Sequence, residues 1–166
     1  PSHFLGTDES GSDLFKKISI GTRISLTIAF SVVFISLVIG LLYGSISGYN
    51  GGKTDAFMMR ALDLFYSFPG FLLALALVCV LGPSIRNLIL ALSITGWTGF
   101  ARLVRGEVLH LKEQDFIQAA KSIGCSKWRI MSFYIWPNMT GVLLVQSTFA
   151  LAGTLIVESG LSFLGL

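Results

Sequence analysis

The chain has 166 residues, of which 53% are apolar and 13% are charged, and its net charge is +3. Charged residues make up about a quarter of an ordinary soluble domain. This composition argues against a soluble domain and favours an integral, all-α membrane protein.

Residues 1–20 are expected to form a segment on the external side of the membrane. The first 17 residues are polar and lack an apolar region followed by a small-residue cleavage site, so they do not resemble a signal peptide. The chain opens without Met and stops in the apolar stretch GLSFLGL. These two ends suggest a fragment of a longer protein.

Four blocks without Asp, Glu, Lys or Arg follow, and each predicts a membrane-spanning helix. A helix of roughly 20 residues crosses a hydrocarbon core of about 30 Å. The third block holds only 15 residues, but Arg102 can extend its side chain toward the headgroups and so lengthen that span. A large soluble core is disfavoured, because four buried helices would all have to be apolar on every side. The predicted spans are residues 24–47, 61–81, 87–104 and 139–157.

The first span and the connection after it carry signals for helix packing and for a turn. Gly40, Gly44 and Gly48 recur every four residues on one face, which permits another helix to approach closely. The stretch SGYNGGKT ends like a phosphate-binding loop, but it joins two apolar spans instead of a strand and a helix. We interpret it as a turn in which Asn50 and Gly51 reverse the chain.

The second span contains Pro69, which removes a backbone hydrogen bond and bends a helix. Such a bend is tolerated where neighbouring helices or a water-filled path satisfy the freed backbone groups. Pro69 is therefore expected either to line a water-filled pathway or to pack against neighbouring helices. Arg60 and Asp63 lie one turn apart and are expected to form a local salt bridge at the membrane surface. A tight turn at residues 82–86, which contains Gly and Pro, follows this span.

The third connection, residues 107–138, is long and charged and is expected to form a helix-turn-helix. One stripe of its first helix follows helical spacing and consists of Phe116, Ala119, Ala120 and Ile123, while Gln118, Lys121 and Ser122 face water. The two central alanines leave room for another backbone or a bulky side chain to approach the helix closely. The stripe therefore predicts either a docking surface or packing on the chain's own spans.

The ends of these two short helices are also predictable. Gly124 is expected to take the left-handed conformation that ends the first helix, and Ser126 is expected to cap the second. Pro137 is expected to terminate or kink the second helix before the last span.

The positions of Lys and Arg predict the orientation in the membrane. With four spans, the first and third connections share one face, and they carry eight of the twelve Lys and Arg residues. The positive-inside rule therefore places residues 107–138 in the cytoplasm. Glu158 then lies at the external end of the last span, where its carboxylate reaches water, and a structural or gate role is expected.

No enzyme signature is present in the sequence. Cys79 and Cys125 are expected to be free thiols, and paired metal-ligand spacings and nucleophile motifs are absent. The chain is therefore not expected to be an enzyme, and we expect it to bind no cofactor, metal or nucleic acid.

The third connection resembles a known family. Gln118-Ala-Ala-Lys-Ser-Ile-Gly124 followed by Ile135-Trp-Pro137 is similar to the EAA loop of bacterial ABC-transporter permease subunits, although Gln118 replaces the usual acid and Trp136 the usual Leu. The stretches HFLGTD, GTRISL, RALD, RLVRG and ESGLSFLG also resemble the dipeptide, oligopeptide and nickel branch, in particular its second permease subunit. The resemblance implies a type I ABC-importer transmembrane domain of six spans, truncated here at 21–166 to four.

The resemblance also implies a mechanism and a set of partners. In such permeases the EAA helix sits in a cleft of a separate ATPase subunit, and the closure of two ATPase subunits on ATP and Mg²⁺ switches the pathway. Ala119, Ala120 and Gly124 would let the helix sit deeply, and Phe116 or Ile123 would fill the cleft. The implied partners are ATP-binding subunits, a second permease subunit and an extracytoplasmic solute-binding protein, in the bacterial inner membrane.

Three alternatives remain open from the sequence. A permease for nickel or another small solute would share most of these motifs. A channel or secondary transporter would need no ATPase and would more often carry charges at the middle of its spans. An intramembrane hydrolase would have to assemble its site from residues far apart in the sequence.

Overall fold

The computed structural model describes residues 6–7 and 11–163, and these are helical except for short turns and an isolated bridge between Thr7 and Asp13. The all-α membrane fold is thereby confirmed for this part of the chain. The parts of the predicted external segment at 1–5 and 8–10, and the last residues 164–166, lie outside it. The elements are α1 (Leu14–Asn50), α2 (Gly52–Tyr66), α3 (Gly70–Leu81), α4 (Ile85–Leu111), α5 (Asp115–Ser122), α6 (Lys127–Ile130), the π turn η1 (Met131–Ile135) and α7 (Trp136–Phe163).

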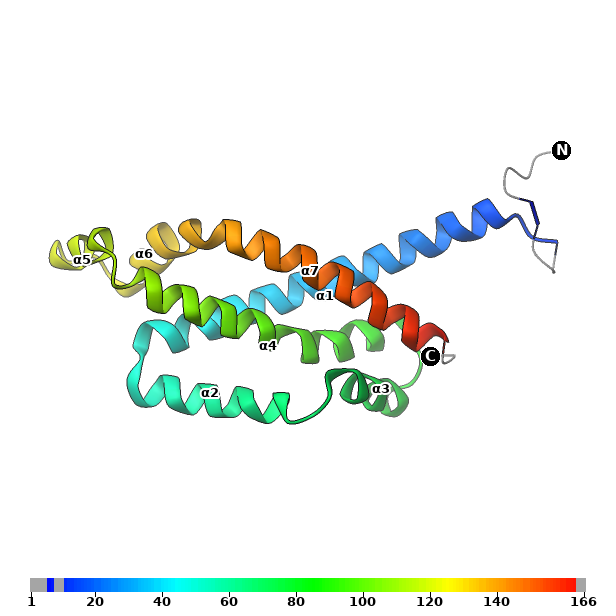
Figure 1. Cartoon of the computed structure of the whole chain (residues 1–166), viewed down its shortest axis with the longest axis horizontal. Coiled ribbons are helices and arrows are strands. Elements are labelled where there is room, and N and C mark those ends of the chain that lie inside the picture. The colour runs from blue at the N-terminus through cyan, green and yellow to red at the C-terminus, as the bar shows by residue number, and fades with distance from the viewer. Residues whose placement is uncertain (1–5, 8–10, 164–166) are drawn as a thin grey trace.

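The long helices lie side by side along the longest axis of the molecule (Figure 1). Among the described residues, three helices are long and apolar enough to cross a membrane: Leu14–Asn50, Ile85–Leu111 and Lys127–Phe163. They contain the predicted spans 24–47, 87–104 and 139–157. The first helix begins ten residues earlier than its predicted span, since Asp13 accepts a hydrogen bond from the backbone of Phe15 at 3.0 Å and caps it.

The predicted bend of the second span, residues 61–81, at Pro69 is confirmed, and it divides the span into two helices. Helix α2 already begins at Gly52, and the helix axis bends by 75° between α2 and α3. Pro69 has no backbone N–H and disfavours helical geometry at Phe68, so the α-helix ends before it and a new one begins after it. The polar connection expected at 48–60 is therefore mostly helix, and α2 and α3 together make at most one broken span.

The turns at the two ends of this broken span agree with the sequence. Gly51 and Gly52 have φ values of +65° and +55°, so the chain reverses at the predicted place within a single residue between α1 and α2. After α3, Gly82 has a φ of +87°, and the hydroxyl of Ser84 accepts a hydrogen bond from the backbone of Asn87 at 3.2 Å. This confirms the tight turn at 82–86.

Helices α1 and α4 pack backbone against backbone through the glycine stripe. A Cβ added at Gly40 would lie 2.8 Å from the backbone N of Ala101, and one added at Gly44 would lie 2.9 Å from the backbone N of Arg105. No side chain fits at such distances, so glycine is required for this contact. The predicted close packing through Gly40, Gly44 and Gly48 is confirmed.

Two apolar clusters hold α3, α5 and α7 against this pair, and a third, around Leu62 and Trp97, holds α2. One lies near the α3–α4 turn and joins α1, α3, α4 and the end of α7 around Ala91 and Leu161. The other lies near α5 and joins α4, α5, η1 and the start of α7 around Val108 and Ile135. Helix α7 itself buries only three residues in the described part of the chain: Met139, Glu158 and Leu161.

Candidate functional site

The predicted docking helix α5 lies at one end of the molecule, beside the turn that joins α1 to α2 (Figure 1). Its end is set by Gly124, which has a φ of +82°. The backbone N–H of Gly124 donates to the carbonyl of Lys121, and that of Cys125 donates to the carbonyl of Ala120, both at 3.0 Å. This pair of bonds closes the helix with a Schellman motif, and the prediction for Gly124 is confirmed.

The second short helix also begins as predicted. The hydroxyl of Ser126 accepts a hydrogen bond from the backbone N–H of Arg129 at 3.3 Å. Pro137 was expected to terminate or kink this helix, and it does not terminate it, because one helix runs from Lys127 through a π turn to Phe163. The π turn before Pro137 allows this, because the backbone of Trp136 bonds to the carbonyl of Met131 five residues back.

The two faces of α5 differ in their surroundings. Phe116, Ala119 and Ile123 are exposed, and the exposed fraction of Ile123 is 79%. Ile117 and Ala120 are buried and pack in one cluster with Val104, Val108 and Ile130. The expected stripe is therefore corrected at one position, since Ala120 is only 3% exposed and faces the chain's own core.

Ile117 had no role in the sequence analysis, although it explains how α5 is held. It lies three residues before Ala120 and its side chain is fully buried. The signal available in the sequence was the second apolar spacing, Ile117 with Ala120, about 100° around the helix axis from the exposed pair Phe116 and Ala119. Ile117 and Ala120 thus join α5 to the apolar cluster that contains Val104 and Val108 of α4.

Polar contacts fix α5 to the end of α4. The side-chain amide of Gln118 donates to the backbone carbonyl of Lys112 at 2.9 Å. A carboxylate at this position would only accept, so it could not make the contact that the Gln118 amide makes. Lys112 in turn donates from Nζ to the carbonyl of Gly48 at 3.2 Å, which joins α4 to the end of α1.

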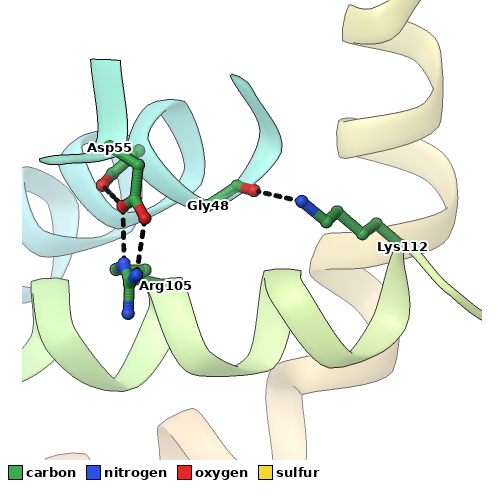
Figure 2. Close-up of polar contacts among 5 residues, drawn as sticks. Gly48, Asp55, Arg105 and Lys112 are labelled. Atoms are coloured by element: carbon green, nitrogen blue, oxygen red, sulfur yellow. Dashed lines mark hydrogen bonds and ion pairs between the residues drawn. The ribbon is translucent and has the colours of Figure 1, made fainter. Parts of the chain in front are cut away.

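An ion pair that the sequence did not reveal joins α2 to α4 at the same end (Figure 2). The guanidinium of Arg105 donates two hydrogen bonds of 2.5 Å to the two oxygens of the Asp55 carboxylate. The hydroxyl of Ser47 donates a third bond to Asp55. The side chains of Arg105 and Asp55 are 30% and 13% exposed, so water weakens this bidentate pair only in part.

The salt bridge expected between Arg60 and Asp63 is replaced by a longer-range one. Asp63 accepts from Arg102 of α4 at 2.8 Å, and Arg102 also lies 4.2 Å from the centre of the Tyr66 ring. The guanidinium can stack on that ring while it binds the carboxylate, which a partner one turn away on the same helix would not allow. Both charged side chains are more than half exposed.

The two candidates for the pathway or gate lie far from α5. Pro69 is exposed and forms the start of α3 at the bend of the broken span. Glu158 is only 8% exposed, which corrects the expectation that its carboxylate reaches water. It accepts hydrogen bonds from Ser25 at 3.1 Å and Ser162 at 3.3 Å, and it borders a cavity of about 250 Å³ beside the α3–α4 turn.

Comparison with known proteins identifies a family model that matches residues 40–166, described as the binding-protein-dependent transport system inner membrane component. The chain is 40% identical over 164 residues to the dipeptide transport system permease protein DppC of Bacillus subtilis, covering 99% of this chain and 51% of that protein. It is 44% identical over 164 residues to the oligopeptide transport system permease protein OppC of Haemophilus influenzae, covering 99% and 53%. It is also 38% identical over 165 residues to the glutathione transport system permease protein GsiD of Pectobacterium atrosepticum, covering 99% and 55%. The chain thus spans about half the length of the curated relatives it matches.

Proposed function

Because the chain belongs to the family of binding-protein-dependent transport system inner membrane components, we propose that it is a permease subunit of an ATP-driven importer of peptides. The relatives are named for the transport of dipeptides, oligopeptides and glutathione, and all three substrates contain peptide bonds. The chain would supply part of one half of the membrane pathway. A second permease subunit and an extracytoplasmic solute-binding protein would complete the system.

Helix α5 is the proposed contact with the ATP-binding subunit. Its exposed face carries Phe116 and Ile123 on either side of the small Ala119, a shape that suits insertion into an apolar cleft. ATP and Mg²⁺ would be bound and hydrolysed by that partner and not by this chain. The single observation that supports this best is that two large apolar side chains stay exposed on a helix whose adjacent face, with Ile117 and Ala120, is buried.

The contacts behind α5 offer a route for motion into the membrane. Ile117 and Ala120 pack on α4, and Lys112 holds the end of α4 to α1. Arg105 on α4 binds Asp55 on α2, and α2 leads to the bend at Pro69. A displacement of α5 would therefore reach the broken span through side chains in direct contact.

The test introduces a charge on the exposed face of α5 in the full-length transporter. Ala119→Glu places a carboxylate between Phe116 and Ile123, whereas Ser122→Glu introduces the same group on the polar side of the helix as a control. Ala120→Glu is a poorer choice, because it would bury the charge against Val104 and Val108 and unfold the loop.

Peptide uptake and ATP hydrolysis are measured in proteoliposomes. We expect Ala119→Glu to reduce uptake at least tenfold while the purified membrane subunits stay folded, and Ser122→Glu to keep near-normal uptake. If the Ala119→Glu transporter imported peptide at the normal rate with normal ATP hydrolysis, the docking role of this face would be refuted.

A further inference from the structure

Three lysines line one hollow beside the docking helix. Lys112 follows α4, Lys121 lies on α5 and Lys127 begins α6, and together with Tyr49, Asn50 and Cys125 they surround a space of about 430 Å³. These residues come from four separate elements that meet at the end of the molecule where α1 turns into α2. The fold, and not the sequence order, gathers the three cations.

Within residues 6–7 and 11–163, none of these lysines forms an ion pair with a carboxylate. Lys112 donates from Nζ to the carbonyl of Gly48 at 3.2 Å, and Lys121 donates to the carbonyl of Lys112 at 3.5 Å. Carbonyl oxygens orient the ammonium groups but do not neutralise them. The hollow therefore favours an anion, which would relieve the repulsion among three like charges.

An apolar groove opens directly beside the hollow and shares Tyr49, Asn50 and Lys127 with it. Its space is about 160 Å³, and its apolar lining consists of Leu42, Ile46, Trp128, Met131 and Trp136. On α1 the exposed side chains of Phe34 and Val38 continue the line of Leu42 and Ile46 at every fourth residue. An apolar track thus leads from the lysines along the length of a membrane-spanning helix.

Two tryptophans mark the boundary between the charged and the apolar part. Trp128 is exposed and packs edge-on against Trp136 with ring centres 5.4 Å apart, and the indole of Trp136 donates to the hydroxyl of Ser45 at 3.0 Å. Trp is enriched at the level of the lipid headgroups, where an apolar ring and a polar N–H can both be satisfied. If Trp128 and Trp136 lie at the level of the lipid headgroups, the adjacent lysine hollow also lies among the headgroups.

We propose that the hollow and groove form a binding site for one anionic phospholipid of the cytoplasmic leaflet. The phosphate of the headgroup would lie among Lys112, Lys121 and Lys127, and an acyl chain would follow the groove between α1 and Trp128. Basic pockets between spanning helices on the cytoplasmic side bind anionic headgroups for this reason. A soluble phosphate would satisfy the lysines but would leave the groove empty.

The lipid and the ATP-binding subunit can occupy α5 at the same time. Lys121 follows Ala119 by two residues, which places it about 200° around the helix axis from the docking face. The site would therefore hold the side of α5 that carries Lys121 while a partner covers the side that carries Phe116 and Ile123. The proposal rests on membrane insertion and does not depend on which solute is transported.

The experiment measures lipid retained by the purified full-length transporter. The complex is delipidated in detergent, mixed with equal amounts of phosphatidylglycerol and phosphatidylcholine, and analysed by native mass spectrometry. The triple variant Lys112→Gln, Lys121→Gln, Lys127→Gln is compared with Lys53→Gln, which removes an exposed lysine on the same side but outside the hollow. A separate sample contains inorganic phosphate in place of lipid. Trp128→Ala tests the groove without a change of charge.

We expect the normal transporter and Lys53→Gln to prefer phosphatidylglycerol equally. Each lysine near the surface contributes about a fivefold gain in affinity, so the triple variant is expected to lose roughly a hundredfold. Trp128→Ala is expected to weaken the lipid and leave the binding of inorganic phosphate unchanged.

Three results would overturn the proposal. The first is equal retention of phosphatidylglycerol by the triple variant and the normal transporter. The second is binding of inorganic phosphate with no preference for the lipid, which would make the hollow a site for a soluble anion. The third is loss of the ATP-binding subunit from the triple variant with lipid retention unchanged, which would assign the lysines to the protein interface.

Discussion

Replacing Gly44 with alanine puts a methyl group into the contact between α1 and α4. The added Cβ would lie 2.8 Å from the Cβ of Val104 and 2.9 Å from the backbone N of Arg105, and still closer to the carbonyl of Ala101. Ordinary van der Waals contact begins at 3.4 Å, so the two helices would have to separate by several tenths of an ångström or more. Two of the three obstructing atoms belong to the backbone of α4 and cannot move aside by changing a rotamer.

Overpacking of this kind costs about 1–3 kcal/mol. Alanine also favours the helical state over glycine by about 1 kcal/mol, which would mask part of that cost. Gly106→Ala is the matched control, because Gly106 lies on α4 with no atom within 4 Å of an added Cβ. Both variants gain the same helical preference, so the difference between them isolates the steric cost.

The free energy of unfolding is measured for the full-length permease in detergent micelles titrated with SDS, with circular dichroism as the signal. We expect Gly44→Ala to unfold about 1–3 kcal/mol more easily than Gly106→Ala. Equal unfolding free energies for the two variants would show that α1 and α4 are not in backbone contact, and the glycine stripe would need another explanation.

Two further comparisons test contacts around the docking helix. Asp55→Asn removes the charge that Arg105 binds and is expected to destabilise the permease by about 1.5–3 kcal/mol. Asp63→Asn, in the more exposed pair with Arg102, is expected to cost at most about 1 kcal/mol. SDS titration measures both losses, and a larger loss for Asp63→Asn than for Asp55→Asn would contradict this ranking. Gly124→Ala forces a side chain into the left-handed region of backbone conformation at a cost of about 1–2 kcal/mol. Hydrogen exchange of the backbone amides at the end of α5 should therefore accelerate. The control Gly141→Ala, at an open helical position, should leave exchange in α5 unchanged. Slow exchange in the Gly124→Ala variant would contradict the role given to the Schellman motif.

The sequence predicts the parts of this structure that depend on neighbouring residues. The glycine spacing on α1 identifies a packing face before its partner is known, and the fold then supplies α4 as that partner. Gly124 and Ser126 set the ends of two short helices through bonds to residues no more than five positions away. Such local bonds leave a clear residue preference in the sequence.

The contacts missed by the sequence analysis join residues far apart in the chain. Asp55 and Arg105 are 50 residues apart, and Asp63 pairs with Arg102 instead of its sequence neighbour Arg60. The burial of Glu158 was missed for the same reason, because its carboxylate accepts a hydrogen bond from Ser25, far away in the chain. Charge and spacing alone offer each of these side chains several partners, and helix packing selects one.

Two features of the helices were predicted only in part. The face of α5 that carries Ala120 turned inward, because Ile117 supplies a second apolar spacing that competes with the first. The bend at Pro69 was predicted but its size of 75° was not, because the size depends on whether neighbouring helices accept it. Periodicity predicts that a helix has an apolar side, but not which of two sides is buried.

The π turn at Met131–Ile135 has a consequence for the orientation of the short helices before it. It holds one residue more than a turn of α-helix would, within a helix that runs unbroken from Lys127 to Phe163. Each residue advances an α-helix by about 100°, so a deletion of one residue here would rotate everything before it by that angle relative to α7. The π turn therefore sets the rotation of α6 relative to α7, which bears on the direction in which Phe116 and Ile123 face the proposed ATP-binding subunit.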